Sequence, residues 1–198
     1  MRILATPAAR RATMILAAAF LSLLDTTGAR AQSGYQYELL VEGGAWLPTA
    51  AIHHDLESAA LAGVAGRYML AYGFALTASA WWAAPSDKNP TSASQQVSVT
   101  QGDLGLEWGK RIASLGSWPV VSLIGGGVGG RTYAPKNVNE PRQSSALGFG
   151  SLSLALFLDH FVWRVEARDN LSTWEGLSGK QSLQGNDVQL RAGAGWRW

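Results

Sequence analysis

Cysteine is absent from the sequence, lysine is scarce, and charged residues make up only 15% of the 198 residues. Without cysteine, neither a disulfide framework nor the lipid-bearing cysteine of a lipoprotein is possible. A charged fraction below the ~25% of soluble domains disfavours an ordinary water-facing exterior. The few lysines lie in expected loops or at a strand end, at Lys88, Lys110, Lys136 and Lys180.

Long hydrophobic runs are also missing. The longest, residues 14–24, contains one serine and as a helix would cover about half of a ~30 Å hydrocarbon core. Arginines precede this run and a small-x-small motif follows it, which is the pattern of a secretory signal peptide. The positions are Arg2, Arg10 and Arg11 before the run and Ala29, Arg30 and Ala31 after it. We therefore expect residues 1–31 to be a signal peptide, cleaved before Gln32, and residues 32–198 to be one domain.

Removing residues 1–31 changes the charge balance. Four of the sixteen basic residues and one of the fourteen acidic residues lie in that segment, which leaves twelve basic against thirteen acidic. The remaining chain is close to neutral, so we expect no basic surface for nucleic acid.

Alternation of apolar and polar residues dominates the chain after residue 32, and helical periodicity is hard to find. The pattern predicts eight strands, at residues 35–47, 57–70, 74–84, 97–111, 120–133, 145–157, 161–174 and 187–198. Short connections alternate with long polar ones, which predicts an up-and-down meander with both termini at the short-turn end. Such a meander can close into an antiparallel barrel, which removes its exposed edges.

Two environments suit this barrel. In water, a periplasmic barrel would turn its apolar face inward around an apolar ligand, as lipocalins do; in a membrane, the apolar face meets lipid. The polar faces carry arginines, acids and glycines, which favours a packed polar interior. Aromatic residues gather at both strand ends, as two membrane interfaces select. They are Tyr35, Tyr37, Tyr68, Tyr72, Trp108, Phe157, Phe161, Trp163, Trp196 and Trp198 at the short-turn end, and Trp46, Trp81, Trp82, Tyr133 and Trp174 near the long loops.

Charged residues on the polar faces are the best candidate site. If the strand phases hold, they form a luminal ion-pair network of Glu38, Glu42, Arg67, Asp103, Glu107, Arg164, Glu166, Arg168, Arg191 and Arg197. The first and last strands become neighbours on closure, so Glu42 and Arg191 are expected to pair. Eight strands leave an interior just wide enough for side chains, so the network is expected to plug the lumen. A narrow gated channel is the alternative.

Other motifs carry weaker signals. The run GGGVGG at residues 125–130 fits a dinucleotide-binding pattern, but no helix follows it, so these glycines are expected to allow curvature or give room to luminal side chains. His53, His54, Asp55 and Ser58 suggest a lipid-modifying barrel enzyme as a further alternative. No complete catalytic motif or third metal ligand accompanies them. We expect no catalytic residue, metal or cofactor.

Over residues 32–198 the chain resembles small bacterial outer-membrane β-barrels of the OmpA/OmpX type. The most specific element is the terminal strand, which resembles the β-signal of outer-membrane proteins in Leu190, Ala192, Ala194, Trp196 and Trp198. The resemblance implies an eight-stranded transmembrane barrel in the outer membrane of a Gram-negative bacterium, with a structural or surface-interaction role.

The resemblance also implies partners. They are outer-membrane lipid and lipopolysaccharide, and, during biogenesis, periplasmic chaperones and the barrel-assembly machinery that recognises the β-signal. No peptidoglycan-binding domain is seen after the barrel, so a tether to the cell wall is not expected. The sequence identifies no partner of the long loops.

Overall fold

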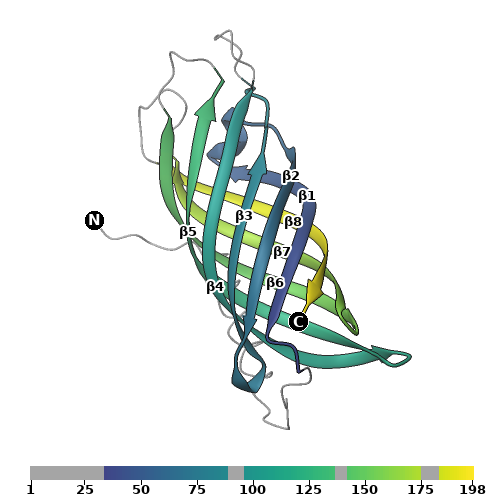
Figure 1. Ribbon diagram of the computed structural model, residues 1–198. Coiled ribbons are helices and arrows are strands. Elements are labelled where there is room, and N and C mark those ends of the chain that lie inside the picture. The colour runs from purple at the N-terminus through teal and green to yellow at the C-terminus, as the bar shows by residue number, and fades with distance from the viewer. Residues whose placement is uncertain (1–33, 89–95, 137–141, 175–182) are drawn as a thin grey trace.

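The computed structural model describes residues 34–88, 96–136, 142–174 and 183–198. Each strand pairs with the next and the last with the first, which closes an antiparallel barrel (Figure 1). The strands are β1 (Tyr37–Ala50), β2 (Ala59–Met69), β3 (Phe74–Ala83), β4 (Val97–Leu115), β5 (Trp118–Pro135), β6 (Gln143–Leu158), β7 (Phe161–Trp174) and β8 (Leu183–Arg197). The predicted eight-stranded up-and-down barrel is confirmed. The expected cleavage site at Ala29, Ala31 and Gln32 lies outside the described residues.

The stagger of the strands sets their tilt. Following paired residues once around the barrel from Glu38 returns to β1 at Pro48, ten residues from the start. In an eight-stranded barrel this stagger corresponds to a tilt of roughly 40°. At that tilt, a strand of about ten residues spans a hydrocarbon core. Among the described residues, no helix is long and apolar enough to cross a bilayer.

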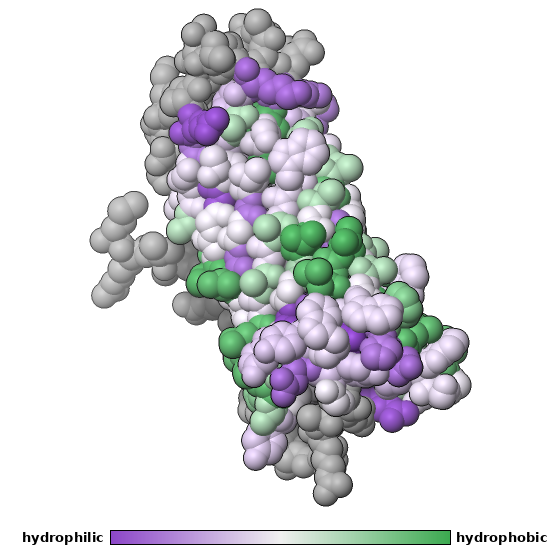
Figure 2. Space-filling view, in the orientation of Figure 1, coloured by the Kyte–Doolittle hydropathy of each residue, from purple (hydrophilic) through white to green (hydrophobic). Residues whose placement is uncertain are grey.

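Within the body of the barrel, side chains alternate between the interior and the exterior. On β7, Trp163 and Val165 are 59% and 53% exposed, whereas Arg164 and Glu166 are 4% and 5% exposed. On the visible face, Figure 2 shows hydrophobic side chains across the middle and lower part of the barrel and hydrophilic ones toward both ends. A polar interior inside an apolar exterior is the arrangement of a transmembrane barrel and the reverse of a soluble, lipocalin-like one.

Tight turns connect the strands at the short-turn end. They are the one-turn helix η1 (Ala71–Gly73), the turn after Leu115, and the turn after Leu158. Gly116 and Asp159 take left-handed backbone angles, with φ of 63° and 56°, which reverse the chain within two residues.

The hairpin of β4 and β5 is longer than the sequence pattern predicts. We expected a connection at residues 112–119, but the strands continue to Leu115 and resume at Trp118, with a bulge between Arg111 and Ala113. Pairing of β3 with β4 ends at Trp108, and pairing of β6 with β5 ends at Val120. Beyond these residues β4 and β5 pair only with each other, so the tip is two-stranded (the teal hairpin at the lower right of Figure 1). The bulge absorbs the extra residue that disrupted the alternation.

Three of the four aromatic residues near the long loops whose side chains the structure describes do not join the predicted second belt. Trp46, Trp81 and Tyr133 point inward and are at most 4% exposed, whereas Trp82 faces outward at 49%. The three inward rings share an apolar cluster with Ile52 and Leu56. The reason is that an aromatic residue at a strand end can cover the lumen as well as meet lipid. Phe157, predicted for the short-turn belt, is also turned inward and 7% exposed.

The first long loop is partly a lid on this cluster. We expected residues 48–56 to form a solvated loop, but they contain the helical turn α2 (Ile52–Asp55). Ile52 and Leu56 are fully buried at the mouth of the barrel, and His53 and His54 point to solvent. Burial of two aliphatic side chains accounts for the ordered turn.

Candidate functional site: the packed lumen

All ten predicted luminal residues lie inside the barrel, and none is more than 8% exposed. Strands β1, β2, β4, β7 and β8 supply them, each from the inward-facing positions of its alternation. They are Glu38, Glu42, Arg67, Asp103, Glu107, Arg164, Glu166, Arg168, Arg191 and Arg197.

Glu107 connects three strands. Its carboxylate accepts a hydrogen bond from Arg67 Nε at 2.8 Å and both terminal nitrogens of Arg164. Arg67 also reaches Glu38, with 2.5 Å between Nη1 and Oε2. Because β2, β4 and β7 are not adjacent, the two ion pairs of Glu107 cross the lumen, whereas Arg67 and Glu38 pair along the wall between the neighbouring strands β1 and β2.

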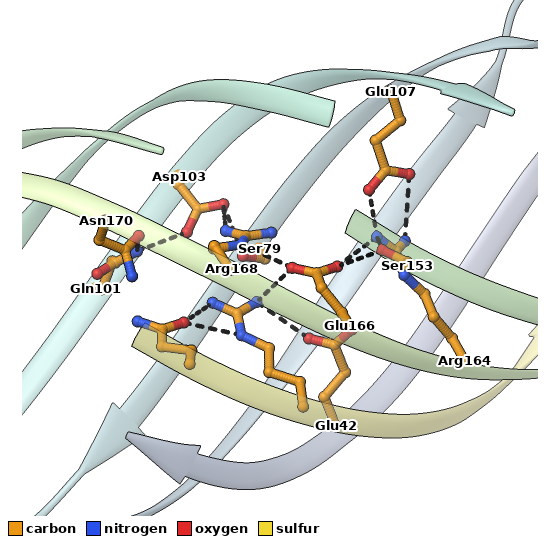
Figure 3. A network of polar contacts seen from close by, with 12 residues as sticks. Glu42, Ser79, Gln101, Asp103, Glu107, Ser153, Arg164, Glu166, Arg168 and Asn170 are labelled. Atoms are coloured by element: carbon orange, nitrogen blue, oxygen red, sulfur yellow. Dashed lines mark hydrogen bonds and ion pairs between the residues drawn. The ribbon is translucent and has the colours of Figure 1, made fainter. Parts of the chain in front are cut away.

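Glu166 extends the same chain of charges (Figure 3). It pairs with Arg164 on one oxygen and with Arg168 on the other, the latter at 2.7 Å. Arg168 continues to Asp103 at 2.7 Å, and its guanidinium stacks 4.0 Å from the centre of the Phe149 ring. Each buried guanidinium here therefore faces at least one carboxylate, as its desolvation requires.

Glu42 and Arg191 come together as expected from strand adjacency. Arg191 Nη1 lies 3.3 Å from Glu42 Oε2, and its Nε donates to Gln189 Oε1 at 2.9 Å. This pair is longer than the others, and the neutral amide of Gln189 shares the guanidinium.

Arg131 and Asp187 form a buried ion pair that the sequence reasoning missed. Arg131 is 1% exposed and Asp187 fully buried. Arg131 also donates to Gln101 at 2.8 Å and to the Tyr133 hydroxyl at 3.0 Å, while Asn170 donates to Asp187 at 2.9 Å. A signal existed, since the inward alternation of β5 continues through the glycines to Arg131. Both residues of the pair lie in predicted strands, at residues 120–133 and 187–198, but neither was included in the predicted luminal set.

Arg197 does not join the ion-pair network, which corrects its predicted role. Among the described residues, no acidic side chain pairs with it. Its guanidinium lies 4.6 Å from the ring centres of both Tyr35 and Phe157, and its Nε donates to the carbonyl of Asp159. The position near the turn explains this, because a backbone carbonyl and two aromatic rings surround the guanidinium there.

The lumen is filled along its length. The Trp46 cluster covers the long-loop end, and a second apolar cluster packs beside the charges in the short-turn half. The second cluster comprises Leu40, Ala65, Leu123, Ala155, Phe157 and Val162. Within the described part of the chain, six acids and six arginines are buried. The interior is thus nearly neutral and self-paired.

Solved structures resemble this barrel, although no protein-family model and no curated protein matches the sequence. The N-terminal β-barrel domain of Pseudomonas aeruginosa OprF shares 12% identity, covering 83% of this chain and 99% of that chain, with a TM-score of 0.54. Neisserial surface protein A shares 8%, covering 82% and 97%, with a TM-score of 0.56. OprG from Pseudomonas aeruginosa shares 15%, covering 84% and 98%, with a TM-score of 0.52.

This chain has the fold of the small outer-membrane barrels. At these identities the likeness concerns the fold, and the roles of individual residues have to come from the chain itself.

Glycines let this outer-membrane barrel fold hold its large luminal side chains. A Cβ on Gly127 would lie 2.1 Å from the Leu104 carbonyl oxygen and 2.7 Å from the Phe149 ring. A Cβ on Gly125 would lie 2.7 Å from Glu107 Cγ. The GGGVGG run therefore gives room to luminal neighbours, one of its two expected roles, and no phosphate-binding helix follows it.

We expect Gly127→Ala to lower the free energy of unfolding by about 1–3 kcal/mol, because the added methyl overpacks the interior. Gly130→Ala is the matched control on the same strand, since a Cβ there meets nothing within 4 Å. Urea titration of vesicle-inserted protein, followed by tryptophan fluorescence, measures both. Equal effects of the two substitutions would contradict the packing role.

The histidine loop contacts Lys88, which lies in the connection between β3 and β4. Lys88 Nζ donates to the His53 carbonyl at 2.7 Å and lies 3.3 Å from its Nδ1. Neither His53 nor His54 hydrogen-bonds to Ser58 among the described residues, where no metal-holding cluster of three ligands occurs either. The loop contributes packing through its buried neighbours Ile52 and Leu56.

The terminal strand β8 closes the barrel against β1. Leu190, Trp196 and Trp198 face outward at 49%, 44% and 54% exposure, and Ala192 and Ala194 lie on the same face. Trp198 exchanges backbone hydrogen bonds with Tyr37 at 3.0 Å in both directions, and their rings stack 6.1 Å apart. The last residue is therefore part of the seam between β8 and β1.

A cluster at the rim supports this seam. His160 stacks on Trp196 at 5.1 Å, and the Tyr35 hydroxyl donates to Asp159 at 3.1 Å. Partial desolvation and the neighbouring Asp159 carboxylate raise the pKa of the Tyr35 hydroxyl above its ordinary value.

Proposed function

We propose that this protein is an integral barrel of the outer membrane of a Gram-negative bacterium, with a structural or surface-interaction role and no enzymatic activity. The long loops face the outside and the termini face the periplasm. The observation that supports this proposal best is an apolar exterior around a packed interior whose charges neutralise one another. Contact with membrane lipid follows from that exterior.

We also propose how the protein reaches the membrane. Residues 1–31 act as a signal peptide cleaved before Gln32, periplasmic chaperones carry the exported chain, and the barrel-assembly machinery recognises the β-signal of Leu190, Ala192, Ala194, Trp196 and Trp198. The outward face of these residues and the edge position of β8 before closure support this role.

Fractionation tests the proposed location. We expect the protein in the detergent-requiring outer-membrane fraction, with gel mobility that changes on boiling, because a closed barrel resists SDS. Recovery among soluble periplasmic proteins, or mobility indifferent to boiling, would refute the proposal.

A structural role for the luminal charges predicts a non-conducting barrel. The network of Glu38, Glu42, Arg67, Asp103, Glu107, Arg164, Glu166, Arg168 and Arg191 plugs and orients the strands, and Arg197 packs at the rim. Planar-bilayer recordings of refolded protein should show no steady, large conductance. Sustained open-channel current from pure protein would favour the gated channel instead.

The absence of an enzymatic role predicts unchanged lipid chemistry. Lipid A mass spectra should be identical with and without the gene, and identical for alanine at His53, His54 and Ser58. A mass difference that these substitutions abolish would establish a lipid-modifying enzyme.

A further inference from the structure

One acidic side chain breaks the apolar exterior. Asp169 occupies an outward position of β7, between the outward-facing Ala167 and Leu171. It lies eight residues beyond Phe161, which at ~3.3 Å per residue and ~40° tilt is about 20 Å from the short-turn aromatic belt, inside an apolar band ~25 Å tall. Leu171, farther toward the long loops, is still apolar and 50% exposed. The carboxylate therefore lies below the rim.

Asp169 has space beside it and no partner among the described side chains. Its strand neighbours are Gly150 on β6 and Val188 on β8. A Cβ added to Gly150 would meet nothing within 4 Å, so the surface next to the carboxylate is open. A carboxylate against hydrocarbon requires hydrogen-bond donors, since none of its oxygens can be satisfied by lipid tails.

An apolar groove on the outer face begins at Ala167 and Leu190, two residues along their strands from Asp169 and Val188, and runs toward the short-turn end. A depression of about 430 Å³ includes Ala167 and Leu190, the cross-strand pair next to Asp169 and Val188. It shares Leu154 and Val165 with a second depression of about 390 Å³, which extends to Trp163 and Ala192. The small outward side chains of β8 lie between larger ones on β7 and on β1, which makes the surface concave.

Groove and carboxylate together define the ligand. The groove suits an acyl chain, and the carboxylate needs a donor at the depth where acyl chains begin. Ester-linked phospholipids carry only acceptors there, whereas an amide-linked, hydroxylated acyl chain carries N–H and O–H groups. We propose that Asp169 and the groove over β6–β8 bind one lipid with an amide-linked 3-hydroxyacyl chain, the chemistry of the lipid portion of lipopolysaccharide. This inference rests on the proposed orientation, which turns the Asp169 half toward the outer leaflet.

Native mass spectrometry of the barrel tests the site. The mature protein is refolded into vesicles with equal mole fractions of lipid A and ester-linked phosphatidylethanolamine, then released in mild detergent. We expect about tenfold more retained lipid A than phosphatidylethanolamine, as one charge-assisted hydrogen bond provides. Asp169→Leu should remove this preference and Asp169→Asn should weaken it. Ala192→Phe, which fills the groove, should reduce retention with the carboxylate intact.

Val64→Asn on β2 is the control, because it changes polarity at another lipid-facing position, 49% exposed and away from the groove. It should leave retention unchanged. Equal retention by wild type and Asp169→Leu, no preference between the lipids, or a bound second protein chain instead of a lipid would overturn the proposal. The boiling assay on the same samples reports the barrel independently, so loss of the site and loss of the membrane barrel give different results.

Discussion

Asp187→Leu is expected to lower the free energy of unfolding by about 3–5 kcal/mol, because it leaves a buried guanidinium without its counter-charge. Arg131 is 1% exposed, and Asp187 is the acid that pairs with it. Gln101 and the Tyr133 hydroxyl would still accept hydrogen bonds from Arg131 but would carry no opposing charge. Urea unfolding in vesicles, monitored by tryptophan fluorescence, gives the free energy.

Removing both charges distinguishes the net contribution of the ion pair to stability from the destabilisation caused by leaving one charge unpaired. The double variant Arg131→Met with Asp187→Leu should recover most of the lost stability, since replacing a buried ion pair by apolar side chains is often neutral. Glu42→Gln is a milder comparison, because its partner Arg191 retains Gln189. If the single and double variants were equally unstable, volume rather than charge would be the cause.

Deleting Trp198 is expected to block assembly of most of the protein, leaving it in the periplasm as degraded or aggregated chain. The residue makes reciprocal backbone hydrogen bonds with Tyr37 and stacks on its ring, so the deletion removes the end of the closing seam. It also removes the terminal aromatic of the proposed β-signal. The measurement is the fraction of protein in the outer membrane that shows a boiling-dependent mobility shift.

Tyr72→Ala is the control for this deletion. Tyr72 is an aromatic residue at the same end of the barrel, 80% exposed and within a turn rather than at the seam. Its loss should reduce assembly little. Normal insertion without Trp198 would count against the β-signal, and refolding into vesicles without the machinery tells whether the seam alone is at fault.

Much of the fold follows from period-two alternation, because a strand with one lipid-facing side constrains every second residue. The same rule put Arg164, Glu166 and Arg168 on one face of β7, where the structure has them. Alternation predicted the wrong strand end where the backbone departs from regular pairing. A bulge near Ile112 shifted the phase of β4.

Which luminal side chains pair with one another was harder to predict than which side chains point into the lumen. Alternation tells which side chains point inward, but partners across the barrel depend on the stagger, which no local pattern encodes. Glu42 and Arg191 were predictable because their strands are adjacent. Glu107 pairs instead with side chains from β2 and β7, and Trp46 covers the lumen although its position at a strand end suited a membrane interface equally well.

The transverse direction of these ion pairs has a consequence for how the chain folds. Arg67 with Glu107, Arg168 with Asp103, and Arg131 with Asp187 each join strands that are not neighbours. In a sheet that has not yet curved and closed, these partners would stand apart, and their charges would meet hydrocarbon unmatched. Partial barrels are therefore unstable, and we expect insertion and closure to occur as one all-or-none event whose late barrier is the approach of the first strand to the last.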